Sequence, residues 1–227
     1  MATPIDTRPA PARIPDGLLN DFSSRWTGLA VSWGHRSATV GTIGPAGTSS
    51  DVVADLLVRH FGMRVRLFTT FDDVLAAVTA GAVDLALVPS AYHGITGFHW
   101  HPGLRLLAYF QHATPEYGIV CRSPEQQPDP AADTLTVASM WEVRDLFAEL
   151  APAALAERTV HWLDAESTQH AARLVAEGAC DLGITNTPGV ESNRLSWIAK
   201  RPGAEIVWSV FENIDACRSG NGQKDSL

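Results

Sequence analysis

The sequence has few of the features that mark nucleic-acid-binding, secreted or membrane-spanning proteins. Its 227 residues include 17 Lys and Arg against 25 Asp and Glu, and no run of basic residues occurs. A phosphate backbone is bound through clustered positive charge, so nucleic acid is not expected as a partner. No stretch approaches the ~18 apolar residues that cross a bilayer, and the first residues lack the basic and apolar regions of a signal peptide. We therefore expect a cytoplasmic protein that binds no membrane, in which a small anion could still find a local positive site.

Cysteine is also scarce, with only Cys121, Cys180 and Cys217 in the chain. They are odd in number, far apart and form no C-x-x-C motif, which argues against a disulfide framework and against a zinc site. Cys121 and Cys180 have apolar neighbours and are predicted to be small core residues.

Histidine offers one pattern that could bind a metal, namely His99-Trp100-His101, with His93 and His112 nearby. Two histidines spaced H-x-H can ligate a metal ion. No carboxylate stands at a supporting position, so packing or surface roles are predicted instead. We expect neither a metal nor a cofactor.

The apolar residues alternate between strand and helix periods along most of the chain. Strands are predicted at 38–43, 65–68, 83–88, 104–110, 118–121, 135–138, 160–163, 182–185 and 206–211. Helices are predicted at 48–61, 71–79, 141–150 and 167–177, with Thr70 or Asp72 available to cap the second. Strands that alternate with helices imply parallel sheets with crossover helices, so the fold class is α/β.

This pattern occurs twice, which predicts two lobes with a cleft between them. The first lobe is expected to comprise 38–113 with 204–215, and the second 114–203. A Pro-rich arm over 1–37, with a short helix near 18–26, and a disordered tail over 216–227 complete the chain. Open α/β sheets bind ligands at the carboxyl ends of their strands, so the loops after Ile43, Val88, Ala138, Leu163 and Thr185 are candidate walls of a site.

Two of these loops combine hydroxyl groups with the start of a helix. Gly44-Pro45-Ala46-Gly47-Thr48-Ser49-Ser50 lets the backbone approach a ligand and offers free N–H groups with the Thr48 and Ser49 hydroxyls. Glu166-Ser167-Thr168 repeats the combination. Either segment could instead be a plain helix cap, and spacing alone does not decide between a cap and a carboxylate site.

Other candidate residues stand at strand ends. Tyr92 or His93, in the turn after Val88, could hydrogen-bond a ligand or transfer a proton, or Tyr92 could simply pack on the lobe surface. Arg122 could hold a carboxylate in bidentate fashion or form a surface ion pair. Asn186 follows a late strand and could also face the cleft.

Taken together, these loops resemble the prephenate dehydratase-like family, whose members have a type II periplasmic-binding-protein fold. Four motifs of the family have counterparts here. They are G-P-x-G-[ST]-x-S at Gly44–Ser50, an acidic-aromatic helix start at Phe71–Asp73, a V-P turn at Val88-Pro89 and E-S-T at Glu166–Thr168. The resemblance covers about residues 38 to 212. The family's Asn after Val-Pro is absent, and its terminal T-R-F is replaced by Ser209-Val210-Phe211, which keeps a hydroxyl but not the arginine.

A closer resemblance is to the prephenate decarboxylases of the bacilysin pathway and their natural-product relatives. Their motifs V-P-x-A-Y-x-G-I, T-P-x-Y-G, T-N and W-S-x-F are similar to residues 88–95, 114–118, 185–186 and 208–211. His93 stands where these relatives are expected to have an acid.

This resemblance implies a carboxy-lyase that decarboxylates prephenate without aromatising the ring, in antibiotic biosynthesis. It implies Tyr92 as proton donor, Ser209 as a second catalytic group, and substrate contacts from Thr48, Ser49, Ser90, Thr114, Tyr117, Arg122, Ser139, Ser167, Thr168 and Asn186. A prephenate dehydratase that forms phenylpyruvate, and a non-catalytic protein that binds a related anion, are the alternatives. The sequence leaves open whether the chain forms a homodimer.

Overall fold

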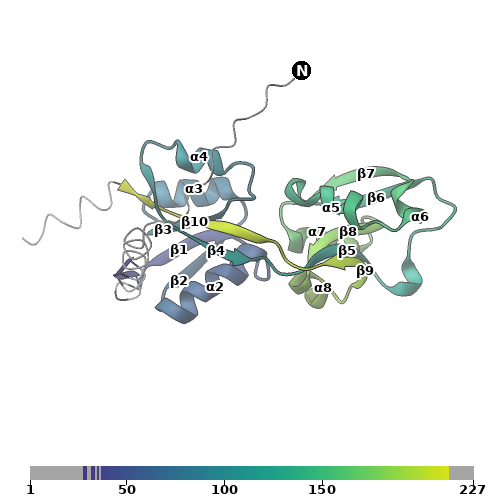
Figure 1. The fold of residues 1–227 in the computed structure, drawn as a ribbon, viewed down its shortest axis with the longest axis horizontal. Coiled ribbons are helices and arrows are strands. Elements are labelled where there is room, and N and C mark those ends of the chain that lie inside the picture. The colour runs from purple at the N-terminus through teal and green to yellow at the C-terminus, as the bar shows by residue number, and fades with distance from the viewer. Residues whose placement is uncertain (1–27, 30–31, 34, 36, 215–227) are drawn as a thin grey trace, which may run out of the picture.

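Two five-stranded sheets form two lobes that lie side by side in Figure 1. The computed structural model describes residues 28–29, 32–33, 35 and 37–214. The helix predicted near 18–26 and the tail predicted over 216–227 lie outside the described residues. No helix in the described part is both long and apolar enough to cross a membrane.

The first lobe contains the sheet β2-β1-β3-β10-β4. β1 pairs in parallel with both β2 and β3, whereas β10 runs antiparallel to β3 and β4. The crossovers between the parallel strands are the helices α2 and α3, as the alternating pattern predicted. The bounds are β1 (Thr39–Ile43), α2 (Ser49–Phe61), β2 (Arg64–Phe68), α3 (Phe71–Thr79), β3 (Leu85–Pro89), β4 (Leu104–Ala113) and β10 (Glu205–Asn213).

The ends of these helices follow from local sequence chemistry. The Thr48 hydroxyl accepts the Asp51 N–H at the start of α2, and Gly62 ends that helix at a φ of 64°. Thr70 and Asp73 cap α3 reciprocally in a capping box, so of the two predicted caps Thr70 is the one used. Capping fixes where each helix begins, and therefore where its free N–H groups point.

The second lobe repeats the strand arrangement of the first, in the order β7-β6-β8-β5-β9. β6 pairs in parallel with β7 and β8, and β5 runs antiparallel to β8 and β9. The bounds are β5 (Tyr117–Cys121), β6 (Thr134–Ser139), α5 (Asp145–Leu150), β7 (Thr159–Asp164), α7 (Thr168–Glu177), β8 (Leu182–Asn186) and β9 (Ser196–Arg201).

Several elements differ from the sequence prediction. The helix predicted at 141–150 is a 3-10 turn (Trp141–Val143) followed by α5, because Val143 and Arg144 donate to carbonyls three residues back rather than four. β9 was not predicted, since its residues are half-buried without alternation. Short helical segments were missed as well: α4 (Ile95–His99), the 3-10 turn Pro124–Gln126, α6 (Ala153–Ala156) and α8 (Thr187–Asn193).

Each lobe has two apolar clusters, one on each face of its sheet. Residues 85–88 are therefore buried from both sides, which explains why β3 reads as an unbroken apolar run. Cys121 and Cys180 are buried in the second lobe, as predicted. Cys217 lies outside the described residues.

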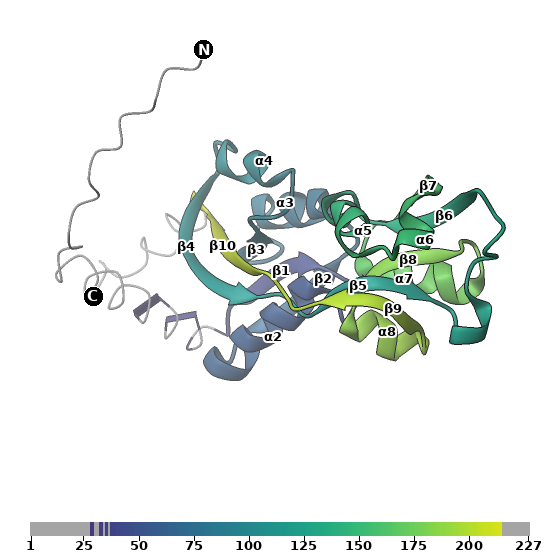
Figure 2. The same ribbon diagram turned by 45° about the vertical axis from the view of Figure 1, so that its right-hand side comes forward.

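The chain passes between the lobes twice, from β4 into β5 and from β9 into β10 (Figure 2). The two passages are hydrogen-bonded to each other, since the Thr114 N–H donates to the Ala204 carbonyl and the Ala204 N–H to the Thr114 hydroxyl. Gly203 makes this contact sterically feasible, because a Cβ there would lie 1.7 Å from the Thr114 carbonyl oxygen. The paired passages form the hinge between the lobes.

Gly203→Ala should therefore lower the free energy of unfolding by about 1–3 kcal/mol, the usual cost of forcing an extra methyl into packed backbone. Gly97→Ala is the matched control: a Cβ at Gly97 would meet nothing within 4 Å, and alanine is the better helix residue, so a gain of about 0.5–1 kcal/mol is expected. Urea unfolding measures both. Equal stability of the two variants would show that the hinge accommodates a methyl group at residue 203.

Candidate active site

A cavity of about 240 Å³ lies between the lobes. Its walls are mostly apolar, and its polar groups come from a few loops at strand ends. The first lobe contributes Ile43, Thr48, Ser49, Ser50, Phe71, Pro89, Ala91, Tyr92, Ala204, Ile206 and Trp208. The second lobe and the hinge contribute Thr114, Tyr117, Met140, Glu142, Val143, Leu146, Ser167, Thr168, Arg201 and Pro202.

The start of α2 forms one polar wall of this cavity. The Thr48 hydroxyl donates to the Ile43 carbonyl and accepts the Asp51 N–H, so it already has partners within its own loop. Ser49 and Ser50 are the first residues of the helix, and their N–H groups have no helical carbonyl to bond. Free N–H groups at the positive end of a helix dipole hold an anion well. Thr48 is thus the helix cap, Ser49 and Ser50 line the cavity, and the carboxylate site at this loop stays a prediction.

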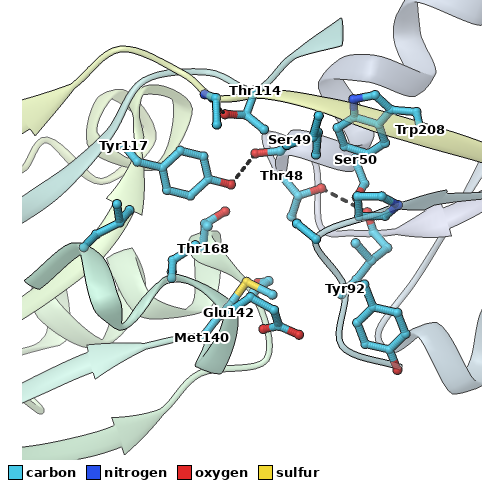
Figure 3. A pocket seen from close by; sticks show the side chains of 18 of the residues that line it. Thr48, Ser49, Ser50, Tyr92, Thr114, Tyr117, Met140, Glu142, Thr168 and Trp208 are labelled. Atoms are coloured by element: carbon cyan, nitrogen blue, oxygen red, sulfur yellow. Dashed lines mark hydrogen bonds between the residues drawn. The ribbon is translucent and has the colours of Figure 1, made fainter. Parts of the chain in front are cut away.

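The start of α7 forms the opposite polar wall. The Ser167 hydroxyl accepts the His170 N–H and caps the helix. Thr168 is only 3% exposed, yet its hydroxyl has no hydrogen-bond partner, and Figure 3 shows it pointing into the cavity. A buried hydroxyl without a partner costs free energy. A ligand with a hydrogen-bonding oxygen at this point would remove that cost.

Hydrogen bonds between the lobes hold the two walls together. Gln169 and Asn186, from the second lobe, both donate to the Gly47 carbonyl, at 3.1 and 3.0 Å. Gly47 has a φ of 87°, and a Cβ there would lie 2.6 Å from the Gln169 amide nitrogen. The Ser49 and Tyr117 hydroxyls, 2.5 Å apart, form a further contact across the cleft (Figure 3). These bonds join the two walls of the cavity across the cleft.

Two tyrosines line the cavity in different ways. The Tyr92 ring packs on Phe71 with centroids 4.4 Å apart, and its hydroxyl points away from Tyr117 and Thr168 in Figure 3. Burial, followed by the charges of Asp72 and Glu142, raises the pKa of Tyr92. Burial also raises the pKa of Tyr117, the bond to Ser49 opposes this, and Glu142 adds to it. Both phenols are therefore weaker acids than free tyrosine.

Glu142 is a cavity residue that the sequence reasoning missed. It lies in the 3-10 turn after β6, its side chain is 13% exposed, and its carboxylate is 2.7 Å from the His93 Nδ1 of the first lobe. The position of Glu142 in the sequence could have revealed it. Glu142 follows the carboxyl end of β6, and the loop after that strand was already predicted to be a wall of the site. Only Ser139 was nominated there, and its hydroxyl donates to the Met140 carbonyl instead.

The structure does not bring every predicted residue to the cavity. Arg122 donates to the Val175 carbonyl near the last turn of α7, so it lies at the opposite end of that helix from Thr168. Ten residues of helix span about 15 Å, which places the guanidinium far from the polar walls. The Ser90 hydroxyl accepts the Val207 N–H, on the sheet of the first lobe.

The remaining predicted residues have structural positions. Asn186 caps α8 and bonds to the Gly47 carbonyl, so it acts on the loop rather than on the cavity. Ser209 is buried opposite Val88 on β10, and its neighbour Trp208 lines the cavity in its place. Thr114 lines the cavity and also joins the two hinge passages. Thr48, Ser49, Tyr92, Tyr117, Ser167 and Thr168 are brought together as predicted.

The histidine cluster has packing roles. His99 packs edge-on against Phe211 at 4.9 Å, and His101 accepts the Gly103 N–H. Among the described residues, no group of three or more His, Cys, Asp or Glu side chains could hold a metal ion. A second cavity adjoins the Gly44-Pro45 segment, shares Ser167 with the first, and is lined by charged groups that include Asp73, His170 and Arg173.

Two α/β lobes with a ligand-sized cavity at their strand ends define the periplasmic-binding-protein type of fold. Similarity to a solved structure supports this class: prephenate dehydratase from Arthrobacter aurescens superposes with a TM-score of 0.57 at 16% identity, over 77% of this chain and 60% of that one. The fold predicted from the sequence is thus confirmed.

The sequence comparisons are more specific. The chain is 32% identical over 181 residues to a prephenate decarboxylase of Planktothrix agardhii, which covers 78% of this chain and 88% of that protein. It is 29% identical over 183 residues to a prephenate decarboxylase of Bacillus subtilis, with 78% and 87% covered. No protein-family model matches. The chain belongs to the prephenate decarboxylase family.

The unpartnered hydroxyl of Thr168 leads to a stability prediction for the ligand-free protein. Thr168→Val keeps the shape and removes the unsatisfied group, so the free energy of unfolding should rise by as much as about 1–3 kcal/mol. Thr48→Val is the control, because that hydroxyl has two partners, and its loss should destabilise by about 1 kcal/mol. Chemical denaturation measures both. A similar loss in both variants would mean that the Thr168 hydroxyl has a partner in the ligand-free protein.

Proposed function

We propose that this protein decarboxylates prephenate and leaves the ring non-aromatic, to give a dihydro-4-hydroxyphenylpyruvate. The observation that carries the proposal is a largely apolar cavity between the lobes, with hydroxyl-bearing helix starts on opposite walls. Prephenate has the matching shape, namely an apolar cyclohexadiene ring with a carboxylate and a pyruvyl group at one carbon and a hydroxyl at the opposite one. The family membership supports the same substrate.

The two polar walls suit the two anionic groups of this substrate. We place one carboxylate against the Ser49 and Ser50 N–H groups at the start of α2, and a second carboxylate or the keto oxygen against the Thr168 hydroxyl. Tyr117 and Ser49 close one side of the cavity by their mutual bond. The apolar side chains of Phe71, Met140 and Trp208 would then surround the ring.

The absence of strong positive charge around the ring fits decarboxylation. Among the lining residues that the structure describes, Arg201 is the one Lys or Arg, and it is paired with Glu149 at 2.8 Å. A carboxylate bound in apolar surroundings loses its hydration, which favours expulsion as neutral CO2. A dehydratase must also protonate the departing ring hydroxyl, whereas this reaction keeps that hydroxyl and protonates a ring carbon.

Product analysis tests the proposal directly. Incubation with prephenate at neutral pH should give CO2 and a product whose ¹H NMR spectrum keeps non-aromatic ring protons and the carbinol proton. Phenylpyruvate above the spontaneous background would identify a dehydratase and contradict the proposal. Thermal stabilisation by prephenate without release of CO2 would identify a binding protein, and it would contradict the proposal equally.

A further inference from the structure

The proposed reaction requires a proton that the substrate does not supply in the bond-breaking step. As the bond between ring C1 and the carboxylate breaks, its electron pair becomes a C1–C2 double bond and CO2 leaves. The electron pair of the former C2–C3 double bond then takes up one proton at C3. An acid must therefore lie within reach of the ring, and it must be reprotonated from solvent after each turnover.

Most proton-bearing groups of the cavity are poor candidates for this acid. The Thr48 and Thr114 hydroxyls donate to backbone carbonyls, and aliphatic hydroxyls are very weak acids. The Tyr117 hydroxyl is bonded to Ser49, and burial makes it a weaker acid than free tyrosine. The Tyr92 hydroxyl points away from the polar walls. Glu142 is the one carboxyl group among the described residues that line the cavity.

The geometry around Glu142 suits a proton donor that is reprotonated from solvent. Glu142 lines the cavity, and its carboxyl group is 2.7 Å from the His93 Nδ1, while the His93 side chain is 66% exposed. This histidine comes from the first lobe and Glu142 from the second, so the pair is complete only when the lobes are closed. A proton can pass from solvent to His93 and then across this contact to Glu142.

We propose, on the basis of the proposed function, that Glu142 is the acid that protonates the ring carbon and that His93 supplies its proton. The contact between the His93 Nδ1 and the Glu142 carboxylate carries a shared proton. Glu142 delivers this proton to the ring, and the exposed imidazole of His93 takes up its replacement from solvent.

The charge of Glu142 acts on both tyrosines of the cavity. Burial is the main cause of the raised pKa of Tyr92 and of Tyr117, and the negative charge of Glu142 adds to it in both. Glu142 therefore makes both competing phenols weaker acids.

The test compares Glu142→Gln and His93→Asn with wild type, in the full chain with prephenate. Glu142→Gln should lower kcat by about 100-fold or more, with KM little changed. Its residual product formed in D2O should carry deuterium on both faces of the ring carbon, where wild type labels one face. His93→Asn should keep the single-face labelling but lower kcat, because Glu142 then loses its proton relay to solvent. Glu177→Gln, at the far end of α7, is the control and should match wild type.

Two results would overturn the proposal. One is a Glu142→Gln enzyme whose kcat lies within threefold of wild type and whose deuterium label stays on one face. The other is scrambled labelling in Tyr92→Phe with unchanged labelling in Glu142→Gln, which would make Tyr92 the donor. Thermal unfolding of each variant shows whether it is folded. Failure of wild type to release CO2 would instead contradict the proposed function, so the two failures are distinguishable.

Discussion

The site depends on one contact between the lobes, the pair of hydrogen bonds from the second lobe to the Gly47 carbonyl. Gln169 and Asn186 reach this oxygen from two different helix starts, and Gly47 has no side chain to keep them away. These bonds hold the start of α2 against the second lobe, where the Ser49 and Tyr117 hydroxyls form a further hydrogen bond. Without them, the walls of the cavity would belong to separate surfaces, and neither wall alone encloses a ligand. This contact thus holds the two walls of the cavity together.

A largely apolar cavity of this kind suits the loss of CO2 better than the loss of a hydroxyl. The anion contacts are backbone N–H groups and neutral hydroxyls, which position a carboxylate without the strong attraction of an unpaired arginine. Arg122, which could have supplied such a charge, is engaged at the other end of α7. The source of the proton is a further structural question. The exposed His93 is 2.7 Å from Glu142, which lines the cavity.

The sequence predicted those features whose cause is local. The buried parallel strands read as apolar runs, and the Thr70 cap and the Ser167-Thr168 helix start are local signals that the structure realises. Features that depend on strand register or on lobe closure were not predictable. Ser209 and Trp208 differ by one position on β10, and that register decides which of them faces the cavity. Glu142 acquires its role from a histidine 49 residues away in the chain, and Asn186 bonds to a loop 139 residues away.

A crystal structure of the Glu142→Gln variant with prephenate bound would test the central claim most directly, because slow turnover would preserve the substrate. The account predicts one carboxylate on the Ser49 and Ser50 N–H groups, a second substrate oxygen on the Thr168 hydroxyl, and the ring between Trp208 and Met140 beside residue 142. Prephenate bound elsewhere, for example in the charged cavity lined by His170 and Arg173, would contradict it. So would a substrate in the first cavity whose anionic groups avoid both helix starts.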